Sequence, residues 1–346
     1  MKHDIGLDIS KKETAVCMID EQGKVLHEKM VKTDPDTIYE TIKEFGTYEI
    51  DTVGLESGSW SYWMEEELMS RGLPALTCDA RKIATFLSLK INKTDKNDAR
   101  GIAECLRVGC ISTIAPKSKR HLGLSVLLKS RKQLVMGKVD LQMAIRGLIK
   151  PFGKMMNPHQ GKAFIESVLK NIKELPETAR EGIEAMIECF KKLTEEIKRL
   201  DKQITKLAGE IPETKRLMSI PGIGMVTALT YYTEIGNPKR FKKSKDVGAY
   251  IGLTPRQYSS GETERLGRIS KKGPPMIRSL LVEAGIVILT RSSKWSKLKA
   301  WGHKIEKKHG RKKAAVALGR KLAVIMHQLL VKEDEQFKYK TLDLVA

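Results

Sequence analysis

The sequence predicts an α/β domain at the N-terminus, a helical coiled-coil region in the middle, and a mainly helical C-terminal domain. Short apolar runs of strand length alternate with helical patterns at first, apolar residues then recur at coiled-coil spacing, and glycine-rich basic segments follow. A length of 346 residues allows two or three domains. We expect domains at 1–113, 114–210 and 211–335, with a tail at 336–346.

The N-terminal pattern is a meander of three strands, followed by helices and strands in alternation. Strands are expected at Ile5–Ile9, Thr14–Ile19, Lys24–Met30, Thr52–Glu56 and Pro74–Cys78, and helices at Thr37–Phe45 and Trp60–Ser70. This order is expected of an RNase H-like fold, in which the first and fourth strands lie side by side. An ATPase of the actin and sugar-kinase type opens in the same way. Its phosphate loop needs a glycine, however, and the residues that follow Asp8 lack one.

Four acidic residues are candidates for a metal site in this domain. Asp8 and Glu56 lie in apolar strands, where a carboxylate is rarely buried without a partner. Asp95 and Asp98 lie three residues apart at the start of a predicted amphipathic helix, which places them on one face. An acidic helix start is also favourable for the helix dipole, so that simpler interpretation stays open for this pair. Four carboxylates without obvious basic partners predict a Mg²⁺ site.

Charge is distributed very unevenly along the chain. Residues 1–100 contain 14 Lys and Arg and 19 Asp and Glu, whereas residues 238–332 contain 24 Lys and Arg and only 5 Asp and Glu. The C-terminal third therefore carries nearly all of the net charge of +21. A polyanionic partner, most simply nucleic acid, is the favoured explanation, and a merely solvated basic surface is the alternative.

Cysteine usage and hydropathy indicate a cytoplasmic, non-membrane protein. The five cysteines have no second Cys or His pair at zinc spacing, so we expect core thiols in a reducing compartment. The N-terminus leads almost directly into the first strand, without the pattern of a signal peptide. The longest apolar run, around Ala284–Leu289, is too short to span a bilayer.

Two long helices with coiled-coil spacing are predicted in the middle region. Leucines recur every seven residues in the first helix (Leu127, Leu134, Leu141, Leu148), and a second series alternates steps of three and four (Ile183, Met186, Phe190, Leu193, Ile197, Leu200, Ile204, Leu207). A segment rich in Pro and Gly at 150–162 separates them. The two helices can pair as an antiparallel hairpin within one chain or with a second subunit.

The C-terminal region opens with a glycine turn. Gly222 and Gly224 lie between two helical patterns and resemble the turn of a helix-hairpin-helix, which presents backbone N–H groups to a phosphate. An ordinary turn between helices explains the same residues equally well.

The segment 248–273 is basic, rich in glycine and poor in apolar residues, and we expect a loop. It contains Ser259 and Ser260 in a flexible turn and a set of basic residues that are candidates for nucleic-acid binding (Arg256, Arg265, Arg268, Lys271, Lys272). A serine needs activation before it can attack, and guanidinium groups with a metal ion can supply it. From residues alone, a loop that only binds phosphate remains the simpler alternative. Further on, Trp295 and Trp301 are interleaved with lysines.

The motifs together resemble the DEDD transposases of bacterial insertion sequences that carry a second, serine-bearing domain, the bridge-RNA-guided recombinases. GLDISK, GLESGSWSYW and NKTDKNDAR carry the four acids, and SIPGIG, AYIGLTPRQYSSG and GRISKKG follow in order. The resemblance implies that the acids form a metal-binding tetrad in a domain similar to Holliday-junction resolvases. It also implies that Ser260, directly before a glycine, is the nucleophile, although the doubled serine leaves Ser259 as an alternative.

The resemblance further implies an activity and partners. We expect a recombinase that cuts and rejoins target and donor DNA through a serine–phosphate linkage, with Mg²⁺ as cofactor and a structured RNA as guide. A homo-oligomer, a dimer or a tetramer, is also expected. The alternatives are a metal-dependent junction nuclease and a non-catalytic nucleic-acid-binding protein.

Overall fold

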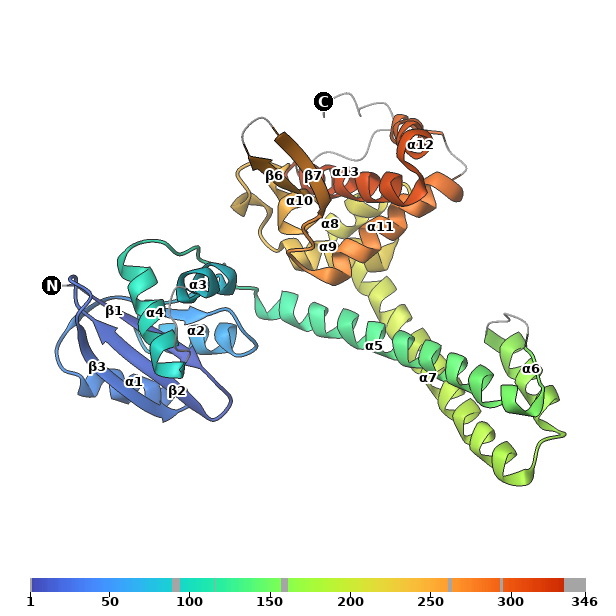
Figure 1. Ribbon diagram of the computed structural model, residues 1–346, viewed down its shortest axis with the longest axis horizontal. Coiled ribbons are helices and arrows are strands. Elements are labelled where there is room, and N and C mark those ends of the chain that lie inside the picture. The colour runs from blue at the N-terminus through green and yellow to red at the C-terminus, as the bar shows by residue number, and fades with distance from the viewer. Residues whose placement is uncertain are drawn as a thin grey trace. The chain divides into compact units, whose positions relative to one another are not determined.

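The computed structural model describes residues 2–88, 94–114, 116–156, 161–260, 263–292 and 295–332 (Figure 1). It consists of two compact units, Met1–Lys117 and Ser118–Ala346, and each is described by itself. The predicted tail at 336–346 lies outside the described residues. The predicted boundary at 210, inside the second unit, stays a prediction.

The first unit is built on a five-stranded sheet in the order β3-β2-β1-β4-β5. Its strands are β1 (Lys2–Ile9), β2 (Glu13–Ile19), β3 (Val25–Lys32), β4 (Glu49–Glu56) and β5 (Ala75–Cys78). The meander β1–β3 is antiparallel, whereas β4 runs parallel to β1 and β5 runs parallel to β4. The first and fourth strands are therefore neighbours, and the predicted strand order of an RNase H-like sheet is confirmed.

Helices cover both faces of this sheet. On one face, α1 (Pro35–Glu44) and α2 (Ser61–Ser70) share a core with the apolar residues of β1, β2 and β4. On the other face lie α3 (Ala80–Leu87), which the sequence did not predict, and α4 (Asp95–Arg107). The sheet is thus the middle layer of three (Figure 1). The close packing of α4 needs glycine beneath it, because a Cβ on Gly6 would lie 2.0 Å from the carbonyl oxygen of Ala99.

A helical hairpin opens the second unit. The helices α5 (Lys119–Leu148) and α7 (Glu177–Glu210) pack side by side, with η1 (Lys150–Phe152) and α6 (Gly161–Ile172) between them in the chain (Figure 1). Arg131 Nε donates to Asp201 Oδ1 at 2.5 Å, and Leu128 shares a core with Ile204, so the two helices are antiparallel. Of the two predicted arrangements, the structure therefore has the antiparallel hairpin within one chain. Supercoiling of the pair stays a prediction.

The predicted leucine seam of α5 is wrong at its end. Leu148 is 53% exposed, whereas Ile145 and Ile149 are buried in its place. In a straight helix, residues seven apart drift by about 20° per heptad. Three heptads after Leu127, that drift has carried the leucine off the buried face.

The rest of the second unit is mainly helical, as predicted. It comprises α8 (Pro212–Met218), α9 (Met225–Ile235), η2 (Pro238–Arg240), α10 (Asp246–Tyr250), α11 (Pro275–Thr290), α12 (Lys297–His309) and α13 (Arg311–Val331). The helix α13 packs against α8, α10, α11 and α12 and supplies much of the core. Within the described chain, α13 alone is long and apolar enough to cross a membrane, but 67% of that stretch is buried inside the unit, as a core helix would be.

Two predictions for this region need correction. The segment 248–273 is not only a loop, because it contains an antiparallel hairpin of β6 (Pro255–Ser260) and β7 (Thr263–Ile269). The cysteines are not all core thiols, because Cys110 and Cys189 are exposed, whereas Cys17, Cys78 and Cys105 are buried.

Candidate functional site

The register of the central strands brings Asp8 and Glu56 together. Gly6 pairs with Gly54 and Leu7 pairs with Leu55, so Asp8 and Glu56 are the next residues on two adjacent parallel strands. Neighbouring strands lie about 4.8 Å apart, and residues two apart on a strand share a face. Both carboxylates therefore lie on the face of Gly6 and Gly54, which is the face that α4 covers. Both residues are half-buried.

Helix α4 brings the other two acids to the same face. Its N-cap is Thr94, whose Oγ1 accepts from the backbone N–H of Asn97 at 3.2 Å. Asp95 and Asp98 occupy the first turn, and Ala99 follows at once, packed against β2 and directly over Gly6. Asp98 is only 9% exposed, whereas Asp95 is exposed.

The four acids share one region of the fold, but they do not form a finished metal cage. Among the described residues, no three His, Cys, Asp or Glu side chains are placed to hold one metal ion. Asp8 and Glu56 each take part in a noncovalent interaction within the protein, so neither carboxylate is isolated, and the expectation that they lack basic partners stays a prediction. The donor set itself, carboxylate oxygen throughout, is chemically suited to a hard divalent cation.

A separate buried carboxylate lies on the opposite face of the sheet. Glu65 on α2 is 5% exposed, and its Oε2 accepts from the Thr77 hydroxyl at 2.5 Å. Burial raises the pKa of Glu65, and the hydrogen bond from Thr77 opposes the shift. Burial also raises the pKa of the Cys78 thiol to about 12. Glu65 and Thr77 belong to the core between α2 and β5, so Glu65 is not a candidate for the metal site, whereas Cys78 lies on the opposite face and packs against Ile83 and Ile102.

Ser260 lies at the tip of the hairpin, in the last position of β6, and its side chain is exposed. It pairs with Thr263 across the turn. No described residue forms a hydrogen bond with the Ser260 hydroxyl. The Ser259 hydroxyl, by contrast, accepts from Gln257 Nε2 at 3.1 Å, and Gln257 also donates to Glu264 at 2.6 Å.

The two faces of the hairpin carry different predicted residues. Side chains alternate along a strand, so Ser260 shares a face with Tyr258 and Arg256, and Arg265 joins them because it pairs with Tyr258. Ser259 lies on the other face. Ser260 therefore shares its face of the hairpin with two arginines, of which Arg265 is nearer to the tip and Arg256 lies near the start of β6, and Ser259 shares the other face with Gln257.

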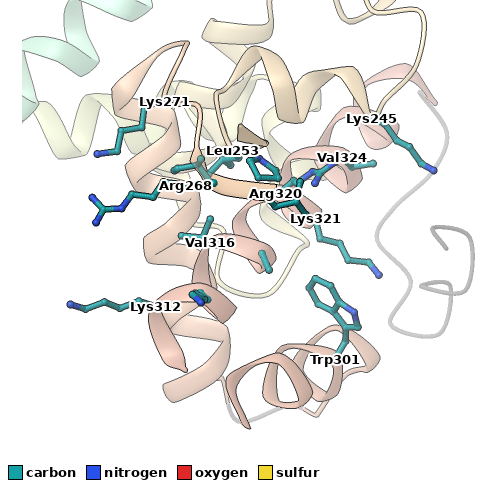
Figure 2. Close-up of a pocket in the computed structure, with 16 residues that line it drawn as sticks. Lys245, Leu253, Arg268, Lys271, Trp301, Lys312, Val316, Arg320, Lys321 and Val324 are labelled. Atoms are coloured by element: carbon teal, nitrogen blue, oxygen red, sulfur yellow. The ribbon is translucent and has the colours of Figure 1, made fainter. Parts of the chain in front are cut away.

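The remaining basic candidates separate into two groups. Arg268 and Lys271 line a cavity between the hairpin and α13, as Figure 2 shows. Lys272 is exposed and does not line this cavity. Sequence alone placed all five basic residues in a single set.

Arg278 is a positioning residue that the sequence analysis missed. Its Nη1 donates to three backbone carbonyls, of Ile251 at 3.1 Å, Lys271 at 3.0 Å and Gly273 at 3.2 Å. Lys271 has φ 55, in the left-handed region that side chains other than glycine rarely adopt. The guanidinium thus fixes the strained loop from which Lys271 projects. The sequence signal that could have identified Arg278 is its position in the first turn of a helix that follows two prolines.

The glycine turn has a clear packing role. Gly222 has φ +80, and a Cβ there would lie 3.0 Å from the carbonyl oxygen of Ala284 on α11. Gly224 is the N-cap of α9 and has open space where a side chain would be. The turn between α8 and α9 therefore needs Gly222 for packing, and only Gly224 leaves room for a ligand at the helix N-terminus.

Comparison with known proteins covers both units of the chain. Residues 5–152 match a family described as Transposase, and residues 214–300 match one described as Transposase IS116/IS110/IS902 family. The transposase for insertion sequence element IS1111A of Coxiella burnetii is 30% identical over 338 residues, which span 95% of this chain and 90% of that protein. A probable family 20 transposase of Pseudomonas aeruginosa is 27% identical over 95% of this chain and 97% of that protein.

A solved structure also matches part of the chain. RuvC of Thermus thermophilus covers 32% of this chain and 99% of its own, with 14% identity and a TM-score of 0.25. A score this low carries no conclusion, so the fold assignment rests on strand order. The sequence matches are decisive for the family. This chain belongs to the IS116/IS110/IS902 family of transposases.

Proposed function

We propose that this transposase cuts and rejoins DNA through a covalent bond between the Ser260 oxygen and a backbone phosphate. DNA is the partner that membership in a transposase family implies. The observation that carries the proposal is the contrast at the hairpin tip. Ser260 is exposed on the face of the hairpin that also carries Arg265 and Arg256, whereas the Ser259 hydroxyl is engaged by Gln257.

The proposed step needs only the serine hydroxyl and a DNA phosphodiester as reactants. The Ser260 Oγ forms a bond to phosphorus as one backbone P–O bond breaks, and the proton lost by the serine ends on the released DNA hydroxyl. Attack of another DNA hydroxyl on the phosphoserine reverses the step and rejoins a strand. Arg265 is suited to hold the oxygens of that phosphate, because guanidinium groups bind them in a bidentate manner, and Arg256, farther along the same face, is suited to hold a neighbouring phosphate.

The acids are suited to hold a divalent ion, for which Mg²⁺ is the expected species. Asp8, Glu56, Asp95 and Asp98 supply only oxygen ligands, and they lie on one face of the sheet and on the helix that covers it. The carboxylates would have to draw closer together on binding. A bound divalent ion stabilises the charge that develops on the phosphoryl oxygens.

Guidance by a structured RNA and assembly into a homo-oligomer belong to the same proposal. The charge contrast between residues 1–100 and 238–332 supports a nucleic-acid-binding C-terminal unit. Exposed apolar side chains on α5, among them Met136, Val139 and Met143, give the helical hairpin a surface for a second copy. Base pairing with an RNA would supply the sequence choice that the protein's own basic side chains do not.

The test is a search for a protein–DNA adduct that survives denaturation. The full-length protein is incubated with Mg²⁺, the element's DNA ends, target DNA and RNA transcribed from the element, and the products are separated on a denaturing gel. Wild type and Ser259→Ala should form the adduct, and Ser260→Ala should bind nucleic acid yet form none. Nicking without an adduct would instead favour a hydrolytic nuclease, and binding without any cleavage would favour a non-catalytic protein.

A further inference from the structure

A large cavity of the second unit is basic at its edges and apolar inside. It has a volume of about 1240 Å³ and lies between the β6–β7 hairpin, α12 and α13. This exceeds the roughly 300–1,000 Å³ of ordinary small-molecule pockets. We call it the basic cavity.

Seven basic side chains line the basic cavity. Helix α13 contributes Lys312, Lys313, Arg320 and Lys321, and the loops and the hairpin contribute Lys245, Arg268 and Lys271. No Asp or Glu occurs among the described residues that line it. Such a one-sided set of charges repels cations and attracts a polyanion.

The interior of the basic cavity is apolar and contains one aromatic ring. Leu253, Val316 and Val324 lie between the charged groups, and Trp301 lies at one edge (Figure 2). The Lys321 ammonium is 4.7 Å from the centre of the Trp301 ring. A ring with a cation over its face is also a ring on which a flat aromatic group can stack.

We propose that the basic cavity binds an unpaired stretch of a nucleic-acid strand, with a base stacked on Trp301 and the phosphates held by the surrounding lysines and arginines. A duplex presents phosphates outward and keeps its base faces stacked, so it would gain nothing from the apolar interior. An unpaired base has two apolar faces to bury, and every base has a face that stacks on an aromatic ring.

The residues that line the basic cavity also predict that it binds nucleic-acid strands with little preference for their sequence. The described lining residues include no Asn, Gln, Ser or Thr, which are the usual neutral groups for reading base edges. Stacking and charge then dominate, and both tolerate any base. A base that stacks on this face of Trp301 would displace the Lys321 ammonium from the ring, and the ammonium could then bind a neighbouring phosphate.

This inference rests on the proposed function in one respect, namely that nucleic acid is the partner of the second unit. It concerns strand binding and not the bond to Ser260, so the two are tested separately. The assay uses full-length protein with Ser260→Ala, which removes the proposed nucleophile. Binding of a short single-stranded thymidine DNA, its RNA counterpart and a duplex of equal length is followed by fluorescence anisotropy at several salt concentrations.

Two pairs of matched variants separate stacking from charge. Trp301→Leu should weaken binding of the single strand by about 5- to 150-fold with an unchanged salt slope. Trp295→Leu, at an exposed tryptophan that does not line the cavity, should have little effect. Lys312→Gln with Lys313→Gln should flatten the salt slope by about 1.4 units, at about 0.7 per phosphate contact. Lys307→Gln with Lys308→Gln, at two lysines that are also exposed but lie outside the cavity lining, is the control.

Cross-linking of the protein with its native tryptophans covers the case in which Trp301→Leu does not fold. A strand that carries 5-iodouracil should cross-link to Trp301, as located by mass spectrometry. Tighter binding of the DNA strand would assign the cavity to DNA, and tighter binding of the RNA strand would assign it to RNA. A cross-link at Trp295 alone, equal binding of duplex and single strand, or equal effects of the two lysine pairs would overturn the proposal. A covalent adduct between Ser260 and DNA, detected separately on the denaturing gel, would remain valid whichever of these results was obtained.

Discussion

The two candidate catalytic regions of this transposase are supported in opposite ways. Asp8 and Glu56 are fixed by the register of two central parallel strands, and α4 is packed onto that sheet through Gly6. Ser260 lies at the exposed tip of a two-stranded hairpin, which carries polar and basic side chains on one face. The difference indicates that the acidic site is placed by a rigid core and that the serine is placed by a projecting element, which is suited to reach a nucleic-acid backbone.

The largest expected effect is the loss of strand cleavage when an acid of the proposed metal site is replaced. Asp95→Asn should lower strand cleavage by about 100-fold or more, because it removes one anionic oxygen ligand from the proposed metal site. Nucleic-acid binding and the fold should be nearly unchanged, since Asp95 is exposed. The control is Asp36→Asn, at another exposed acid in the first turn of a helix. Wild-type cleavage by the Asp95 variant would mean that this carboxylate does not serve the metal site.

Substitutions in the helical hairpin of α5 and α7 test whether the stability of the second unit depends on buried apolar side chains, as we expect for the sheet. Leu193→Asp with Leu200→Asp should lower the free energy of unfolding by about 3 kcal/mol or more, because Leu200 is buried and Leu193 lies close to Gly137 of α5. Leu148→Asp should change it by less than about 0.5 kcal/mol, because Leu148 is exposed. Denaturant unfolding gives both values. Sedimentation shows whether either variant loses self-association, and an unchanged oligomer in both would remove this hairpin from assembly.

The next prediction concerns charge in the second unit. Lys271→Gln with Lys272→Gln should weaken DNA binding and flatten the dependence of log affinity on log salt, by about 0.9 for each phosphate that the protein no longer neutralises. Lys202→Gln, at an exposed lysine on α7, should leave the slope unchanged. Because only Lys271 lines the basic cavity, single variants should assign most of the effect to Lys271 for an unpaired strand. If neither variant alters the slope, these lysines face solvent only.

The smallest expected effect is on the pH dependence of stability in the unit that contains the sheet. The folded-state pKa of Glu65 is raised by burial, so its carboxyl favours folding most below its unfolded pKa, and this contribution is lost as pH rises through the folded pKa. Glu65→Gln keeps an acceptor for Thr77 and removes this titration. The variant should gain stability relative to wild type as pH rises from acid to neutral. Thermal unfolding across that range measures it, with the exposed Glu66→Gln as control; a constant difference between wild type and Glu65→Gln would contradict the assignment.

Sequence predicted the first region well because regular elements carry their own geometry. Strand order and alternation were enough to place Asp8 beside Glu56, and helical spacing placed Asp95 and Asp98 in one turn. The hairpin was missed because 255–269 has too few apolar residues for a strand pattern. The seven-residue spacing ending at Leu148 misled because a straight helix does not keep that spacing on one face. The basic cavity is built by tertiary packing of segments between residues 245 and 324, which no local pattern reveals.

The most direct test of the central claim is to locate the covalent bond between protein and DNA. The adduct formed by the full-length protein is digested with nuclease and protease, and mass spectrometry identifies the residue that retains a nucleotide remnant. The account predicts the remnant on Ser260 in the wild type and in Ser259→Ala, with little or none in Asp95→Asn. A remnant on Ser259, or cleaved DNA with no remnant on any residue, would contradict it.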